Sequence, residues 1–126
     1  MAVDYQRAEE LGKRLSDDSV TSNQIRKLLS GINRLTNRIA AEPCAEPCGE
    51  LSPALQGELQ LVRARLAYQV GKAEDKDKEG LKEGLRELYR ALDPYFKKIG
   101  KETKKFQELA NYVEAIVAYH KYHEKN

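Results

Sequence analysis

Apolar side chains recur three and four positions apart in several stretches of the chain, a spacing that places them on one face of an α-helix. The two clearest stretches cover residues 21–41 and 53–70. Their apolar positions are Ile25, Leu28, Leu29, Ile32, Leu35 and Ile39 in the first stretch and Leu55, Leu59, Val62, Leu66 and Val70 in the second. Ser52 and Pro53 are typical of a helix start, and Gly71 is typical of a helix stop. The pattern therefore predicts two core helices.

Two weaker patterns predict further helices. Residues 4–15 carry a modest apolar face. A second set of residues shares the same spacing later in the chain: Leu81, Leu85, Leu88 and Leu92. Asp93 and Pro94 are expected to end that helix and to start a short fifth one, because proline has no N–H to donate to the preceding turn.

The last stretch, residues 103–123, is apolar or aromatic over more than half of its circumference. A helix covered in this way either lies at the centre of a bundle or carries a second interface. Tyrosine suits such an interface because it can bury its ring and keep its hydroxyl group hydrated or paired. The candidate interface residues are Tyr112, Tyr119 and Tyr122.

Two polar stretches are expected to connect the helices. Residues 42–51 repeat Glu-Pro-Cys, and their two prolines and one glycine forbid a continuous helix. Residues 73–80 are dense in charges of both signs, which is typical of an exposed loop. The length of 126 residues and the helix-forming composition predict one all-α domain over residues 1–126. We expect a compact bundle of five or six helices with the C-terminal helix at its centre.

The first core helix has a basic side without carboxylates. Lys27, Arg34 and Arg38 follow its polar face, Gly31 leaves a gap in the row, and Arg26 flanks it. No Asp or Glu occurs anywhere in this helix. A solvated helix face usually mixes both signs of charge, so this row favours a polyanionic partner over the alternative of an inert solvated face.

The second core helix repeats this one-sided charge. Arg63, Arg65 and Lys72 flank or oppose its apolar stripe, and no acidic residue lies between Glu58 and Glu74. The net charge of the chain is only +2, so the prediction depends on where the charges lie. A group of lysines over residues 97–105 is a weaker candidate, because an acidic residue lies among them and such lysines commonly serve solubility alone.

The cysteines of the connector leave three alternatives open. Cys44 and Cys48 could bind a metal together with His120 and His123, form a disulfide, or remain free thiols. Nothing in the sequence brings the connector and the C-terminal end together. We therefore predict no metal and no cofactor, and take free thiols as the default; both histidines are expected to be packing or surface residues.

Three classes of function are disfavoured. The sequence has no nucleophile beside a base, no glycine-rich phosphate loop and no carboxylate cluster on an apolar face, so an enzyme is not expected. A helix-turn-helix DNA binder would need an orderly helix and a short glycine turn before residue 21. No apolar run approaches the roughly 18 residues that cross a bilayer, and no signal-peptide pattern is found. We expect a cytoplasmic protein without membrane contact.

Three blocks carry a resemblance to a known family. They are residues 21–38, with S-N-Q-I-R-K-L-L-S at the centre, residues 61–72 (L-V-R-A-R-L-A-Y-Q-V-G-K) and residues 112–122 (Y-V-E-A-I-V-A-Y-H-K-Y). Together and in this order they resemble the small subunit of the type III-A CRISPR effector, the Csm complex. That family commonly has arginine at the places of Asn111 and Lys72, methionine at the place of Val113 and a Gly-Gly tail that is missing here. The Glu-Pro-Cys connector has no counterpart in the family pattern.

The resemblance implies a non-catalytic helical subunit that stacks in several copies along a ribonucleoprotein filament. It also implies contacts with guide RNA, target RNA, other CRISPR effector subunits and neighbouring copies of the chain. The basic residues are then expected to bind RNA phosphates without reading bases: Arg26, Lys27, Arg34, Arg38, Arg63, Arg65 and Lys72. The alternative is a purely structural interaction module in which the tyrosines mediate assembly and the basic face is inert.

Overall fold

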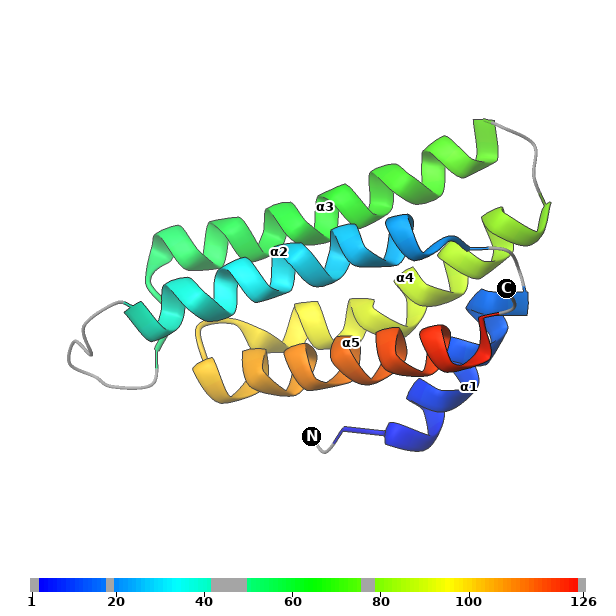
Figure 1. Cartoon of the computed structure of the whole chain (residues 1–126). Helices are drawn as coiled ribbons and strands as arrows, with labels where there is room; N and C mark the ends of the chain where they lie inside the picture. The colour runs from blue at the N-terminus through cyan, green and yellow to red at the C-terminus, as the bar shows by residue number, and fades with distance from the viewer. Residues whose placement is uncertain (1–2, 18–19, 42–49, 76–78, 125–126) are drawn as a thin grey trace.

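The computed structural model describes residues 3–17, 20–41, 50–75 and 79–124, apart from the side chains at 22, 74, 75 and 79–82. The described residues form five α-helices and contain no strand beyond an isolated bridge between Glu50 and Glu102 (Figure 1). The predicted all-α bundle is confirmed. The helices are α1 (Tyr5–Asp17), α2 (Ser22–Ala41), α3 (Pro53–Asp75), α4 (Glu79–Ile99) and α5 (Thr103–His123).

Helices α2 and α3 begin where polar side chains satisfy free backbone N–H groups. Thr21 and Gln24 form a reciprocal pair at the start of α2: the Gln24 N–H donates to Thr21 Oγ1 at 3.3 Å, and the Thr21 N–H donates to Gln24 Oε1 at 2.8 Å. The Leu55 N–H donates to Ser52 Oγ at 3.3 Å, so the predicted start of α3 is confirmed. The sequence thus fixes both core helices at their N-termini.

Helices α2 and α3 run antiparallel to each other and form one side of the bundle (Figure 1). Helix α3 also packs on α4, whereas α5 packs against α1, α2 and α4. The C-terminal helix therefore has the central position that its wide apolar surface predicts. Within the described residues the backbones of α5 and α3 do not approach each other, so these two helices are not direct neighbours.

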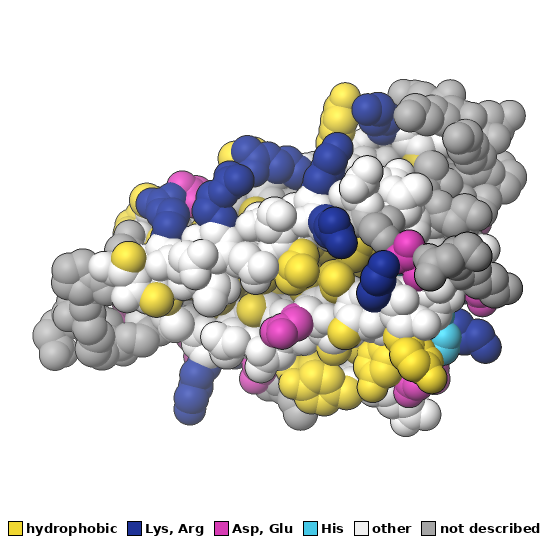
Figure 2. Space-filling model, in the orientation of Figure 1, with side chains coloured by type: hydrophobic (Ala, Val, Ile, Leu, Met, Phe, Trp, Pro, Cys, Tyr) yellow, Lys and Arg dark blue, Asp and Glu magenta, His cyan; other side chains and the backbone are white. Residues whose placement is uncertain are grey.

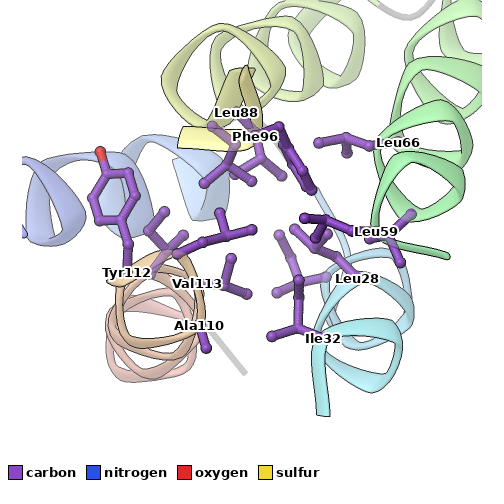
Figure 3. Close-up of a cluster of buried hydrophobic side chains, with 14 of the residues drawn as sticks. Leu28, Ile32, Leu59, Leu66, Leu88, Phe96, Ala110, Tyr112 and Val113 are labelled. Atoms are coloured by element: carbon purple, nitrogen blue, oxygen red, sulfur yellow. The ribbon is translucent and has the colours of Figure 1, made fainter. Parts of the chain in front are cut away.

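The core lies where α2, α3, α4 and α5 converge. Leu28 and Ile32 from α2 face Leu59 and Leu66 from α3, with Phe96 of α4 between the helices (Figure 3). All of these side chains are buried. Burial of each large apolar side chain stabilises the fold by roughly 1.5–3 kcal/mol. The predicted apolar stripes of both core helices are therefore the residues that hold the bundle together.

Two predicted helix ends are wrong because burial continues past them. Helix α3 runs through Gly71 and reaches Asp75, and Ala73 is buried at 3% exposure. Since α4 already begins at Glu79, most of the predicted loop over residues 73–80 is helical, and only 76–78 lie outside the described residues. A helical glycine costs about 1 kcal/mol relative to alanine, and burial of Ala73 favours continuing the helix past Gly71.

Pro94 lies inside α4 and does not start a separate fifth helix. The predicted break is wrong because the apolar stripe keeps its phase across the proline. Leu92, Phe96 and Ile99 are each at most 1% exposed, on the two sides of Pro94. An interior proline costs roughly 3 kcal/mol, and burial of this last turn of the helix outweighs that cost.

The connector that follows α2 returns to the bundle at a defined point. The Leu51 N–H donates to the Lys101 carbonyl at 2.6 Å, and Lys101 Nζ lies 3.2 Å from Glu50 Oε1. Leu51 is buried, and Gly100 makes the α4–α5 turn with a positive φ of 53°. Residues 42–49, which include Cys44 and Cys48 and nearly all of the predicted connector, lie outside the described residues.

Helices α1 and α5 approach more closely than side chains normally allow. A Cβ atom placed on Gly12 would lie 2.6 Å from Tyr119 Cβ and 2.7 Å from the backbone nitrogen of His120. His120 is 3% exposed, and its Nε2 lies 2.7 Å from the Val20 carbonyl oxygen. The expectation that His120 is a packing residue is confirmed.

Helices α3 and α4 are joined by a polar contact on the flank of the bundle. Arg63 Nε donates to Asp93 Oδ1 at 2.7 Å, and Lys97 Nζ lies 3.1 Å from Asp93 Oδ2. Burial opposes ionisation of Asp93, but hydrogen bonds from Lys97 and Arg63 and their positive charges hold its pKa below the ordinary value of 3.8. The contact therefore favours the folded state only while Asp93 is ionised.

Gly12→Ala is expected to destabilise the protein by roughly 2 kcal/mol, because the added methyl group meets backbone and not a flexible side-chain end. Gly57→Ala is the matched control. Its Cβ would meet nothing within 4 Å, so this variant should gain about 0.5–1 kcal/mol from helix propensity. Urea denaturation followed by circular dichroism measures both free energies of unfolding. Equal effects of the two substitutions would contradict the close α1–α5 contact.

Asp93→Asn is expected to lower the free energy of unfolding by about 1 kcal/mol at neutral pH. The lowered pKa makes the stabilisation complete above the unfolded-state value of 3.8 and removes it as pH falls through the lower folded-state value. The difference between wild type and variant should therefore be greatest near neutral pH and shrink in acid. Thermal melts at a series of pH values measure it, and a gap independent of pH would show that the ion pair does not contribute.

Candidate nucleic-acid interface

The predicted basic residues of α2 divide between two flanks of the helix. Lys27 and Arg34 are exposed and lie on the side that turns toward α3, together with the half-buried Arg38. Arg26 is also exposed, but it comes one residue before Lys27 and so lies about 100° around the helix. Three of the four predicted cations of α2 therefore share one side, and Arg26 lies on the other flank.

The predicted basic residues of α3 divide in the same way. Arg65 and Lys72 are exposed and line the side of α3 that faces α2. Arg63 lies on the opposite flank, where it binds Asp93 of α4. Residues two positions apart in a helix point about 200° apart around its axis, so Arg63 and Arg65 cannot share a face. The prediction that Arg63 belongs to the same basic face is wrong, because its ion pair belongs to the α3–α4 contact.

A groove separates the exposed sides of α2 and α3. Its volume is about 490 Å³, and its apolar floor includes Leu28, Val62 and Leu66. Gly31 also lies in the floor, where a Cβ atom would stand 3.4 Å from Val62 Cγ2, an ordinary contact distance. Gly31 is thus not required for the helices to pack, and its missing side chain leaves the groove open.

Cations line the rim of this groove. Lys27 from α2 and Arg65 and Lys72 from α3 contribute to it, and none of the three forms an ion pair with a carboxylate that the structure describes. Most Lys and Arg side chains visible on this face lie over α2 and α3 (Figure 2). A groove with cations on both walls and no acidic residue in its described lining attracts anions more strongly than the net charge of +2 suggests.

Arg38 continues the basic row of α2 but is paired. Its guanidinium group binds the Glu58 carboxylate of α3, and both side chains are about 40% exposed. Arg34 has no such partner among the described residues and lies between Arg38 and Gly31 along the helix. Arg34 is therefore the better placed of the two to bind a phosphate outside the groove.

The second group of lysines is largely neutralised by its own chain. Lys97 lies 3.1 Å from Asp93, Lys101 lies 3.2 Å from Glu50, and Lys105 lies 2.9 Å from Glu102. Each of these distances joins an ammonium nitrogen to a carboxylate oxygen. These ion pairs agree with the expectation that this surface is the weaker candidate for phosphate binding.

The three tyrosines predicted as an interface do not form one exposed ridge. Tyr112 is 2% exposed and points away from the main cluster of Figure 3, and its ring stacks on Tyr95 with centroids 4.7 Å apart. Burial, with a smaller effect of Tyr95, raises the pKa of Tyr112 to about 12. The interface assignment of Tyr112 is wrong, because α1 and α4 cover this side of α5. Tyr119 is half-buried against Gly12 of α1, whereas Tyr122 is 79% exposed.

Four residues that line the groove were not predicted from the sequence: Gln24, Tyr68, Gln69 and Ala73. Tyr68 is 70% exposed. It lies three residues after Arg65 and four before Lys72, outside the apolar stripe of α3. An aromatic residue on the polar side of a helix, between two cations, is the signal that could have identified it.

Further features of the described residues bear on function. None of their His, Cys, Asp and Glu side chains gather in a group of three or more that could hold a metal ion. The alternative of a metal set with Cys44 and Cys48 falls on residues outside the described part of the chain. No helix in the described part of the chain is long and apolar enough to cross a bilayer.

Comparison with known proteins agrees with the resemblance noted in the sequence. The family model described as Csm2 Type III-A matches residues 3–126. Comparison with curated proteins gives no match. The family match covers both groove helices and all five helices of the bundle. The chain therefore belongs to the Csm2 family, the small subunits of the type III-A CRISPR effector.

Proposed function

We propose that this chain is a non-catalytic subunit that holds guide RNA and target RNA through the groove between α2 and α3. The observation that carries the proposal is the set of cations on the groove rim, Lys27, Arg65 and Lys72, which no described carboxylate neutralises. Arg34 extends this surface along α2. Phosphate oxygens are the acceptors that such cations bind, and they carry no sequence information.

Binding without sequence readout suits a subunit that must accept any guide and any target. Sequence recognition is left to base pairing between the two RNA strands, as in other RNA-guided complexes. One copy of the chain offers few cations, so its own affinity is low. Several copies stacked along one filament in the cytoplasm, beside the other effector subunits, bind strongly because each raises the effective concentration of the next.

Arg34→Gln and Arg65→Gln are each expected to weaken binding to single-stranded RNA to the same extent for unrelated sequences. Each lost phosphate contact should flatten the slope of log affinity against log salt concentration by about 0.7. Fluorescence anisotropy with two RNAs of different sequence, repeated over a salt series, measures both effects.

Arg63→Gln and Lys13→Gln are the matched controls for this experiment. Arg63 faces α4, and Lys13 is exposed on α1, which packs against α4 and α5. Both controls remove one positive charge and should leave the salt slope at the wild-type value. Slopes that fall equally in all four variants would show that net charge, and not the groove, attracts RNA.

A purely structural role is the second candidate, and one observation favours it. Tyr122 near the end of α5 is 79% exposed, and tyrosine is enriched at protein interfaces. In that case α5 binds a neighbouring subunit and the groove is inert. Tyr119 is a poor probe of this role, because its replacement would also disturb the contact with Gly12 of α1.

Tyr122→Ala is therefore the better test of the structural role. If the exposed ring packs on a neighbouring subunit, the variant should co-purify with the effector subunits several-fold less well, while its affinity for RNA stays at the wild-type value. Tyr5→Ala, which changes an exposed tyrosine on α1, is the control. Unchanged recovery of the Tyr122 variant with the assembly would argue against an interface at this end of α5.

A further inference from the structure

We infer that the α2–α3 groove takes the base of an unpaired nucleotide, stacked on Tyr68, while the rim cations hold the neighbouring phosphates. This inference rests on the proposed function, since it requires that the groove binds RNA. It goes further by assigning the groove to single-stranded RNA and by giving Tyr68 a direct part in binding.

Tyr68 stands at the rim of the groove between two cations. Its side chain is 70% exposed on the groove rim, whereas Tyr112 of the same chain is buried in the core. Arg65 and Lys72 lie one helical turn before and after it, so the ring has a cation on each side. Aromatic rings bordered by cations are the combination with which proteins bind single strands, because bases stack on the ring and phosphates pair with the cations.

The shape of the groove also suits a base. A volume of about 490 Å³ falls within the range of sites that bind small organic molecules. Leu28, Val62 and Leu66 give it an apolar floor, and Gly31 adds no side chain that would fill the space above it. Phosphate binding alone needs only surface cations. A hollow with an apolar floor beside them suits a flat, weakly polar ring.

Stacking on an aromatic ring does not require a particular base, because every base has a π-face. The site therefore tolerates every sequence, as the proposed function requires.

These features favour an unpaired nucleotide over the other occupants of such a groove. In an A-form duplex the bases are stacked inside, and only a single strand or a splayed-out nucleotide can place a ring on Tyr68. A segment of a partner protein is the main competitor for the apolar floor. Lys27, Arg65 and Lys72 on the rim favour the polyanion, because no described acid offsets their charge.

The test compares two short single-stranded RNAs that differ at one central position. One carries the fluorescent base 2-aminopurine there, and the other carries an abasic site. The purified full chain should bind the first about tenfold more tightly and should quench its fluorescence by stacking. Tyr68→Ala should abolish both the preference and the quenching, whereas Tyr68→Phe should keep them. Tyr122→Ala is the control for loss of an exposed tyrosine.

The outcomes separate this inference from the function on which it rests. If wild type binds both RNAs equally, with salt-dependent affinity, the base pocket is wrong and phosphate binding stands. If wild type binds neither RNA at any salt concentration, the proposed function fails and the base pocket fails with it. If Tyr68→Ala keeps full RNA binding but no longer co-purifies with the effector subunits, the groove holds a protein segment and the inference is overturned.

Discussion

The packing of α2 against α3 is the constraint on which the surface of this protein depends. Leu28, Ile32, Leu59 and Leu66 are buried between these helices and their neighbours, so the orientation of each helix about its own axis is fixed. A fixed rotation also decides where every polar side chain points. The basic groove is therefore a direct consequence of core packing.

Sequence patterns predicted the core helices well, because apolar periodicity reports burial directly. They failed at Gly71 and Pro94, where burial of apolar side chains stabilises the helix more than the local helix-breaking preference destabilises it. Ala73 and Phe96, both buried beyond the predicted breaks, supply the energy that local propensity does not include. A glycine or proline therefore predicts a helix end only where the apolar pattern also ends at that residue.

The candidate site was predicted in part, for a geometric reason. The row of cations on α2 could be found from the pattern of one helix. Which other helix lies next to each flank of that helix could not be found in this way. Arg63 and Arg65 look equivalent in the sequence, but one faces Asp93 of α4 and the other faces the groove. Tyr112 and Tyr122 likewise share a helix and differ in what covers them. The apolar pattern of a single sequence shows which face of a helix is buried, but it does not show which other helix packs against that face.

Glu50 and Leu51, at the end of the connector, are anchored to Lys101 in the α4–α5 turn. Ala41 ends α2 on one side of the connector, and the contact with the α4–α5 turn holds its other side. Extra residues inserted between these two fixed ends would alter neither helix, and the entropy of closing a longer loop grows by only about 0.6 kcal/mol per doubling of length. The Glu-Pro-Cys duplication is thus an expansion that the architecture can absorb, which makes this segment a natural place for relatives to differ in length.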